Sequence, residues 1–206
     1  MKFLQLLLAI NVIILFTLCE SGDGPNPNRK VTGTGPVVSK TLNLQSFSKI
    51  ENTGVANFNI TLGDDPQAVV LKAQQNIIDI MTYEVINETL YIGIEENTSI
   101  ENAEEIRFEI TINEINDIKL VGVGNFELSG DFQDELSISL TGVGNVEAYD
   151  LEVGVCTIIS TGVGDCKVNV RDELDVTITG IGTVFYIGNP TITQSVSGMG
   201  NLINAN

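Results

Sequence analysis

The sequence predicts an all-β fold, more specifically a single-stranded β-solenoid (β-helix-like) with about 18–20 residues per coil and Gly-x-Gly corners. The second half of the chain repeats a Gly-x-Gly motif five times, and the first glycines of successive motifs are 20, 20, 18 and 18 residues apart. Apolar and polar residues alternate on both sides of each motif, which is typical of short strands. The motif glycines are Gly122, Gly124, Gly142, Gly144, Gly162, Gly164, Gly180, Gly182, Gly198 and Gly200.

Each repeat is expected to consist of a strand, a tight glycine corner and a second strand. The glycines allow a positive φ and a close approach of backbones at the corner. We expect the residue between them to point inward and to fill the corner. These residues are Val123, Val143, Val163, Ile181 and Met199.

A polar residue follows each motif at a fixed position, three residues after its first glycine. Stacked coils lie about 4.8 Å apart, so side-chain amides at this position could bond to one another along the stack as a ladder. A preference of Asn and Asp for turns is the alternative explanation. The candidate ladder residues are Asn125, Asn145, Asp165, Thr183 and Asn201.

The composition excludes several classes of function. The formal net charge of the 206-residue chain is −17, which argues against a nucleic-acid partner because phosphate binding needs clustered Lys and Arg. The sequence contains no His, so a Ser-His-Asp triad, a Cys-His dyad and a His-type zinc site are excluded. We predict no cofactor and no catalytic residue.

Residues 1–18 are predicted to be a signal peptide, because Lys2 precedes an apolar run that is short for a membrane span. The run ends at Cys19 in a segment that resembles a bacterial lipobox, which predicts lipid attachment at Cys19. Leu18 departs from the small residue usual there, and ordinary cleavage is the alternative. Residues 19–30 are rich in Gly, Pro and Asn and are expected to be a flexible tether. The expected location is the outer membrane or cell surface, with a periplasm-facing placement as the alternative, and the lipid as the only membrane contact.

Residues 31–115 are predicted to form an irregular N-terminal β half that caps the regular repeats of residues 116–206. The segment from Thr53 to Phe58 matches the repeat corner, with Ala56 in place of the second glycine. Strands are expected at 58–62, 69–72 and 106–112, a hairpin at 83–94, and a helical turn at 76–81. An acidic loop contains Glu95, Glu96, Glu101, Glu104 and Glu105.

Three segments and the chain of glycine corners together resemble the head GIN domain family of putative auto-transporter adhesins. The segments are Val55–Asp64, Asn76–Ile80 and Thr89–Ile92, and the similarity extends from Ser39 to Asn206. The resemblance implies a β-solenoid similar in outline to pectin lyases, in a secreted or lipid-anchored envelope protein of Gram-negative bacteria. The resemblance does not imply any particular set of catalytic residues.

Two acidic pairs, Asp134-Glu135 and Asp172-Glu173, occupy equivalent loop positions two coils apart, or about 9.6 Å along the stack. This is near the spacing of about 6.5–9.5 Å between the carboxylates of inverting glycosidases, and such oxygens could also bind Ca²⁺. The pair would flank a notch at Gly154-Val155. The alternative, which we adopt, is that these residues only keep the loops soluble. Cys156 and Cys166 fall on inward positions too far apart for a disulfide, so we interpret them as core residues.

The favoured function is a non-catalytic binding or adhesion module of the cell envelope, with a glycan or a protein as its surface ligand. A carbohydrate-active enzyme of pectin-lyase-like shape and a structural protein of envelope assembly are the alternatives. The last coil, residues 191–204, is expected to leave Val196, Met199 and Leu202 half covered. Weak self-association through this C-terminal coil is therefore also expected.

Overall fold

The computed structural model describes residues 29–206, which contain one short helix and 17 strands. Fifteen of the strands form one sheet, and β1 (Arg29–Thr32) and β8 (Thr98–Asn102) form a separate parallel pair. The all-β class is therefore confirmed. The remaining elements of the N-terminal half are β2 (Val37–Thr41), β3 (Lys49–Asn52), β4 (Asn57–Leu62), β5 (Ala68–Gln74), α1 (Gln75–Ile78), β6 (Met81–Ile86), β7 (Thr89–Ile94) and β9 (Ile106–Ile112).

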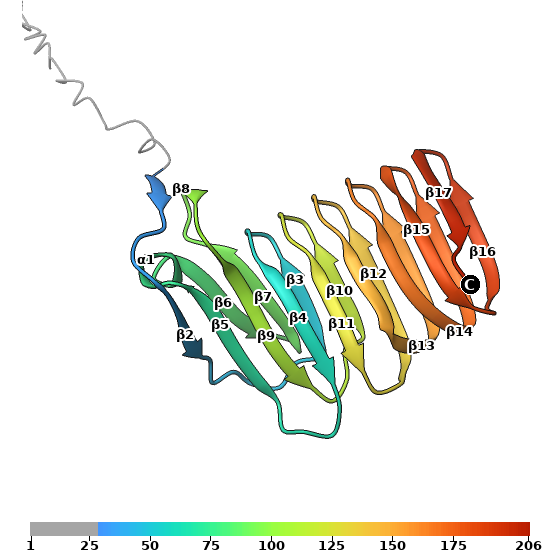
Figure 1. The fold of residues 1–206 in the computed structure, drawn as a ribbon, viewed down its shortest axis with the longest axis horizontal. Coiled ribbons are helices and arrows are strands. Elements are labelled where there is room, and N and C mark those ends of the chain that lie inside the picture. Colours follow the sequence, from blue (N-terminus) through green and yellow to red (C-terminus); the bar gives the residue numbers. More distant parts are fainter. Residues whose placement is uncertain (1–28) are drawn as a thin grey trace, which may run out of the picture.

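The strands of the C-terminal half follow the Gly-x-Gly repeat. They are β10 (Asp117–Leu120), β11 (Phe126–Gly130), β12 (Gln133–Leu140), β13 (Val146–Ser160), β14 (Cys166–Ile178), β15 (Ile181–Gly188), β16 (Thr191–Val196) and β17 (Met199–Asn204). Figure 1 shows them side by side along the long axis of the molecule, in the order of the chain.

Successive repeats pair in parallel, with partners 20 or 18 residues apart. The strand before each corner pairs with the strand before the next corner, as in Leu140 with Ser160, which pairs in turn with Ile178. The strand after each corner does the same, as in Val146 with Cys166, which pairs with Val184. The sheet therefore has two rows of strands. One row contains β3, β10, β12 and β16, the other contains β4, β11, β15 and β17, and the long strands β13 and β14 run through both.

The N-terminal half adds an earlier coil to this stack. β3 pairs with β10 and β4 pairs with β11, so residues 49–62 stack directly on residues 117–130. Between these two coils the chain leaves the stack and forms β5 to β9. β7 and β9 return to pair in parallel with β3 and β4, whereas β5 pairs with β9, and β6 with β7, in antiparallel fashion.

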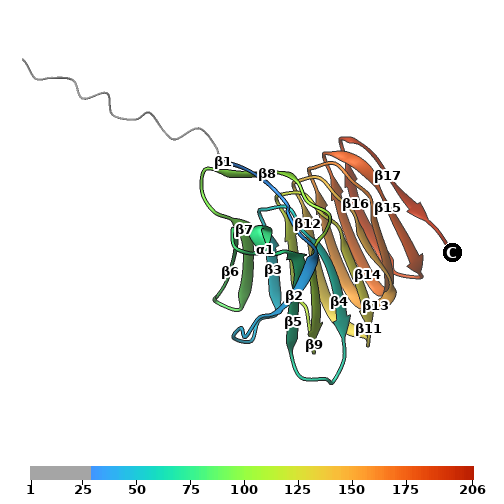
Figure 2. The ribbon, with the colours of Figure 1, turned by 60° about the vertical axis from the view of Figure 1, so that its left-hand side comes forward.

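The sheet curls around one continuous apolar core. Inward positions alternate with outward ones along the strands, and the ring of Phe58 stacks between those of Phe108 and Phe126 at 5.4 and 4.3 Å. α1 contributes the buried Ile77 and Ile78 to the same core. A single-stranded solenoid would contain only parallel pairs, whereas the N-terminal half also contains antiparallel pairs within the curled sheet. The solenoid therefore stays an interpretation for the repeats alone. Figure 2 shows the two rows of strands from a second side.

Candidate binding site

The residue between the two corner glycines points outward, so the prediction that it fills the corner is wrong. Val55, Val123, Val143, Val163 and Ile181 are 39–51% exposed, and Met199 is 73% exposed. Parallel backbone bridges link the first five of them in order. The reason is alternation along the chain: Leu120 and Phe126 are buried, and Val123 falls on the opposite set of positions, with the exposed Val121 and Asn125. We call these six residues the corner row.

The two glycines of each corner are required for different reasons. The second glycine of the first four motifs, Gly124, Gly144, Gly164 and Gly182, has a φ of 148–152°. The first glycine has no such φ but lies against the preceding backbone. Ala56, at the equivalent position of the earliest corner, has no positive φ. The corner that contains Ala56 is the first of the series, so no earlier corner lies against it.

The polar residues after the corners are connected by hydrogen bonds. Asn145 Nδ2 donates to Asn125 Oδ1 at 3.1 Å, and the backbone N–H groups of Asn145 and Asp165 donate to the side-chain oxygens of Asn125 and Asn145 at 2.9 Å. The N–H of Thr183 donates to Asp165 Oδ1 at 2.7 Å.

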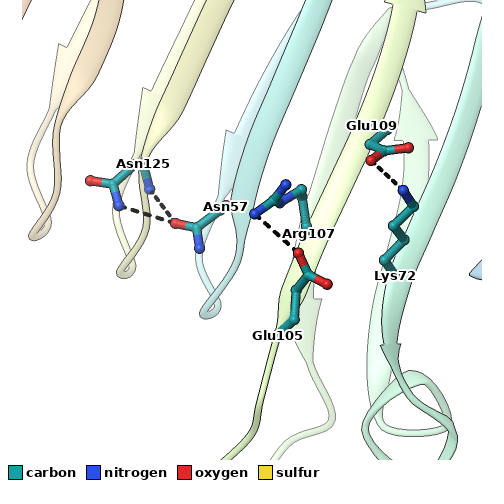
Figure 3. A network of polar contacts seen from close by, with 6 residues as sticks. All are labelled: Asn57, Lys72, Glu105, Arg107, Glu109 and Asn125. Carbon is teal, nitrogen blue, oxygen red and sulfur yellow. Dashed lines mark hydrogen bonds and ion pairs between the residues drawn. The ribbon is translucent and has the colours of Figure 1, made fainter. Parts of the chain in front are cut away.

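The same series begins one coil earlier than the sequence indicated. Asn57 Oδ1 accepts hydrogen bonds from the backbone N–H and the Nδ2 of Asn125, at 3.0 and 3.1 Å (Figure 3). Asn201 makes no side-chain hydrogen bond to the preceding coil within residues 29–206. The structure thus brings four of the five candidate residues into one series and adds Asn57 to it.

A groove of about 600 Å³ lies beside the start of the corner row. Val55, Ala56, Val123 and Val143 form one wall, Asn57 and the next two Asn side chains are beside them, and residues 100–106 form the other wall. We call it the corner groove. It exists because the coil of β7 and β9 does not make a tight corner; its connection, residues 95–105, is displaced and carries β8 instead.

The far wall of the corner groove is acidic. Glu101 pairs with Lys30 at 2.7 Å, and Glu105 pairs with Arg107 at 3.0 Å (Figure 3). Glu104 makes no ion pair with any residue in 29–206. The groove therefore combines an apolar row, unpaired negative charge and side-chain amides.

A second depression, of about 590 Å³, lies on the outward face of β4, β11 and β13. Its lining is polar and includes Glu127, Glu147, Tyr149 and Lys167. Lys167 Nζ lies 2.9 Å from Glu147 Oε1, and this hydrogen bond raises the pKa of the lysine. Partial burial raises the pKa of Tyr149, so its hydroxyl stays protonated and can donate hydrogen bonds.

The predicted acidic pairs lie two coils apart, in the expected register: Glu135 pairs with Val155, which pairs with Glu173. The notch between them is not open, because the ring of Phe132 lies close to Gly154. The guanidinium of Arg171 stacks over this ring at 4.3 Å and pairs with Asp172 at 2.7 Å, which lowers the pKa of that carboxyl. In residues 29–206, no group of three or more His, Cys, Asp or Glu side chains is placed to hold a metal ion.

Cys156 and Cys166 are free and buried, which confirms their interpretation as core residues. Burial raises the pKa of the Cys156 thiol to about 12 and that of Cys166 well above its usual value. Cys19, the predicted lipid attachment site, lies outside the described residues. None of the described helices has the length and hydropathy of a membrane-crossing segment.

Sequence inspection missed the corner groove, although two residues signal it. Ala56 replaces a glycine, and Asn52 replaces the apolar residue two positions before the first glycine. Asn52 is fully buried; its Oδ1 accepts from the N–H of Gly54 at 3.0 Å, and its Nδ2 donates to the carbonyl of Val123 at 3.3 Å. In the later corners, the N–H of the first glycine bonds instead to a backbone carbonyl of the preceding coil. Asn52 thus replaces a missing neighbour.

Comparison with solved structures supports the fold. A putative adhesin from Bacteroides fragilis NCTC 9343 matches with a TM-score of 0.53 and 20% identity, over 84% of this chain and 98% of that one. Two further structures match less well. A putative adhesin from Parabacteroides merdae ATCC 43184 has a TM-score of 0.45 and 16% identity, over 85% of this chain and 100% of that one. A putative cell adhesion protein from Clostridium sporogenes ATCC 15579 has a TM-score of 0.42 and 16% identity, over 81% and 97%.

A search of curated proteins finds no match. The sequence model of one family matches residues 46–135 and 117–190, and its description is "Putative auto-transporter adhesin, head GIN domain". The two matches overlap and together span both the earliest coil and the regular repeats. The chain belongs to the head GIN domain family of putative auto-transporter adhesins.

Proposed function

We propose that this protein is an exported, non-catalytic binding module with an adhesion-like role, and that its ligand binds along the corner row and the corner groove. The exposed corner row is the observation that carries the proposal. Six apolar side chains lie side by side at the outer edge of the stack, and exposed apolar rows beside a groove are typical of interaction surfaces. The family and the names of the solved structures, which are those of adhesins, support the same role.

The ligand class is tested with arrays of immobilised glycans and of purified extracellular-matrix proteins, probed with the full chain. We expect saturable binding to at least one class, and a loss of at least tenfold when Val123 and Val143 are both changed to Ser. Ile159→Ser is the matched control, because Ile159 is 45% exposed but lies on the outward face of β13, before the corner and outside the corner row. Binding that is equally weakened by both changes would contradict the assignment to the corner row.

The alternative of a carbohydrate-active enzyme rests on the two acidic pairs. Asp172 is engaged by Arg171, and Phe132 lies in the notch between the pairs, so these carboxylates do not converge on an open site. Release of reducing ends or unsaturated products from uronic acid polymers, lost in Asp134→Asn, would overturn the non-catalytic assignment.

We also propose that Cys19 carries a lipid that holds the domain at the outer membrane or cell surface. Labelling of cells with a palmitate analogue tests this, and Cys19→Ala should abolish the label. A label that persists in this variant would contradict lipidation at Cys19.

We also propose that the protein associates weakly with itself through the C-terminal coil. Within residues 29–206, β16 pairs only with β14 and β17 pairs only with β15, and Val196 and Met199 are exposed. Sedimentation of the full chain should show association that rises with concentration and decreases in Val196→Lys. A strict monomer at high concentration would contradict it.

A further inference from the structure

The backbone of the corner row is open at Val55. In later corners, the N–H of the central residue donates to the first glycine of the preceding coil, as Val123 N–H donates to the carbonyl of Gly54 at 2.9 Å. The carbonyl of Val123 in turn accepts from the N–H of Ala56 at 3.0 Å. Neither the N–H nor the carbonyl of Val55 forms a hydrogen bond with another residue in 29–206. Both groups belong to a residue that lines the corner groove.

The hydrogen bonds of the later corners indicate which partner would bond to the N–H and the carbonyl of Val55. A residue of the ligand would lie opposite Val55, as Val55 itself lies opposite Val123. The carbonyl of the ligand residue before it would accept from the N–H of Val55, and the N–H of the residue after it would donate to the carbonyl of Val55. A peptide backbone offers this pair of groups on three consecutive residues, which makes an extended polypeptide segment the matching ligand.

Two neighbouring features match such a ligand. An apolar side chain opposite Val55 would extend the corner row beyond Val123 and Val143, whose side chains line the same groove. Asn57, the first residue of the amide series, has an Nδ2 group that makes no hydrogen bond with another described residue, and it can donate to a carbonyl of the ligand.

The charge of the groove indicates a basic ligand. Residues 100–106 bring Glu101, Glu104 and Glu105 to the far wall, and no Lys or Arg among residues 29–206 lines the groove. Lys30 and Arg107 already pair with two of the three carboxylates, which leaves Glu104 to attract a cation. A Lys or Arg next to the apolar residue of the ligand would face this wall.

We propose that the corner groove binds an extended, basic segment of a partner protein, which pairs with the backbone of Val55 and continues the corner row by one chain. The inference rests on the proposed function as a binding module and specifies its ligand. The partner is recognised by alternation of apolar and basic residues rather than by a folded surface. It would enter the gap at Val55, which is bounded on one side by the backbone of Gly93 against Gly54 and on the other by the pairing of Arg107 with Asn57.

A fluorescent hexapeptide of alternating lysine and valine tests this with the full chain. Two versions carry backbone N-methyl groups, one on the lysine amides and the other on the valine amides. With valine opposite Val55, the lysine amide must donate to the carbonyl of Val55, whereas the valine amide faces away. Fluorescence anisotropy should therefore show at least tenfold weaker binding for the lysine-methylated peptide and nearly unchanged binding for the valine-methylated one. Equal affinities of the two methylated peptides would overturn backbone pairing.

Charge recognition is tested with matched substitutions in the protein. Glu104→Gln should weaken binding of the unmethylated peptide by about threefold or more at low salt, and less at high salt. Glu96→Gln is the control, since Glu96 is exposed on the same connection but does not line the groove. Equal losses in both variants would indicate attraction to the acidic chain as a whole and would overturn the site.

The peptide and array experiments fail in distinguishable ways. If an array ligand binds and depends on Val123 and Val143 but no peptide binds, the binding module stands and the inference about its ligand is wrong. If a glycan displaces the bound peptide, the two share the groove, and the lysine-methylated peptide decides whether backbone pairing contributes. If neither array ligand nor peptide binds, both are wrong.

Discussion

The corners of the regular repeats and the corner at Val55 share one motif but differ in their neighbours. Each regular corner lies against the corner before it, and the backbone N–H of its central residue donates a hydrogen bond to that corner. The second position of each regular corner is a glycine, because a Cβ there would overlap a carbonyl oxygen of the corner before it. The corner at Val55 has no such neighbour. There Ala56 replaces the glycine, and the side chain of the buried Asn52 accepts the hydrogen bond from Gly54 N–H that a carbonyl of a preceding coil would otherwise accept.

This difference shows that stacking, rather than the turn itself, imposes the glycines. Ala56 turns the chain without a positive φ. At Gly124, one coil later, an added Cβ would overlap the carbonyl oxygen of Ala56, so only glycine fits there. The departures at Asn52 and Ala56 coincide with the corner that has no preceding corner, and in this protein that place is a groove.

The largest expected effect concerns the buried thiols of the regular stack. In a Cys19→Ala chain at pH 8, Cys156 and Cys166 should react with a thiol reagent at least about a thousandfold more slowly than in the unfolded chain. Their pKa values are raised by burial, so both thiols stay protonated, and labelling requires unfolding against several kcal/mol of stability. Labelling within tenfold of the unfolded rate would mean that the regular stack opens readily, and would contradict its tight packing around these thiols.

The next largest effect compares the two corners directly. Gly144→Val should reduce the free energy of unfolding by more than about 3 kcal/mol, because it adds backbone strain to overlap with the carbonyl of Gly124. Ala56→Gly should cost only about 0.5–1 kcal/mol, mainly through entropy. Denaturant melts of both variants measure the difference. Equal midpoints would contradict the role of stacking.

A smaller effect is expected within the amide series. Asn145→Ala removes one side-chain donor and one acceptor, and should cost about 1–2 kcal/mol. Asn201→Ala, at the equivalent position of the last coil, should change stability by less than about 0.5 kcal/mol because no described residue of the preceding coil bonds to its side chain. A cost at Asn201 as large as that at Asn145 would contradict the assigned bonds.

The smallest effect is expected on the outward face. Glu147→Lys places a lysine beside Lys167, which is unfavourable, but also beside Glu127, which is favourable. Because the pair is exposed to solvent, the unfolding midpoint should shift less than in Asn145→Ala, and the shift should decrease in high salt. A larger shift that persists in high salt would mean that this face is not a simple solvated surface.

Periodicity predicted the all-β class, and pairing within the repeats follows the same register. The alternation of Leu140, Val146 and their equivalents reports burial directly, because inward and outward positions of a strand differ in the residues they accept. The corner at Thr53–Phe58 was also recognisable, since its residues align with those of the next coil.

The parts that sequence could not give depend on contacts between distant segments. The closure of the acidic notch depends on Phe132 and Arg171 meeting over the coil that lies between them. The corner groove requires the displacement of residues 95–105, and no local pattern in that segment specifies where it lies.

Amide hydrogen exchange at the centres of the corners tests the central claim most directly. The N–H groups of Val123, Val143 and Val163 are bonded at 2.9–3.0 Å to the preceding coil, whereas that of Val55 is open. In the free chain, the amide of Val55 should exchange at least about a hundredfold faster than the other three. Protection of Val55 equal to theirs would mean that its edge is already occupied, and would contradict both the open corner and the site built on it.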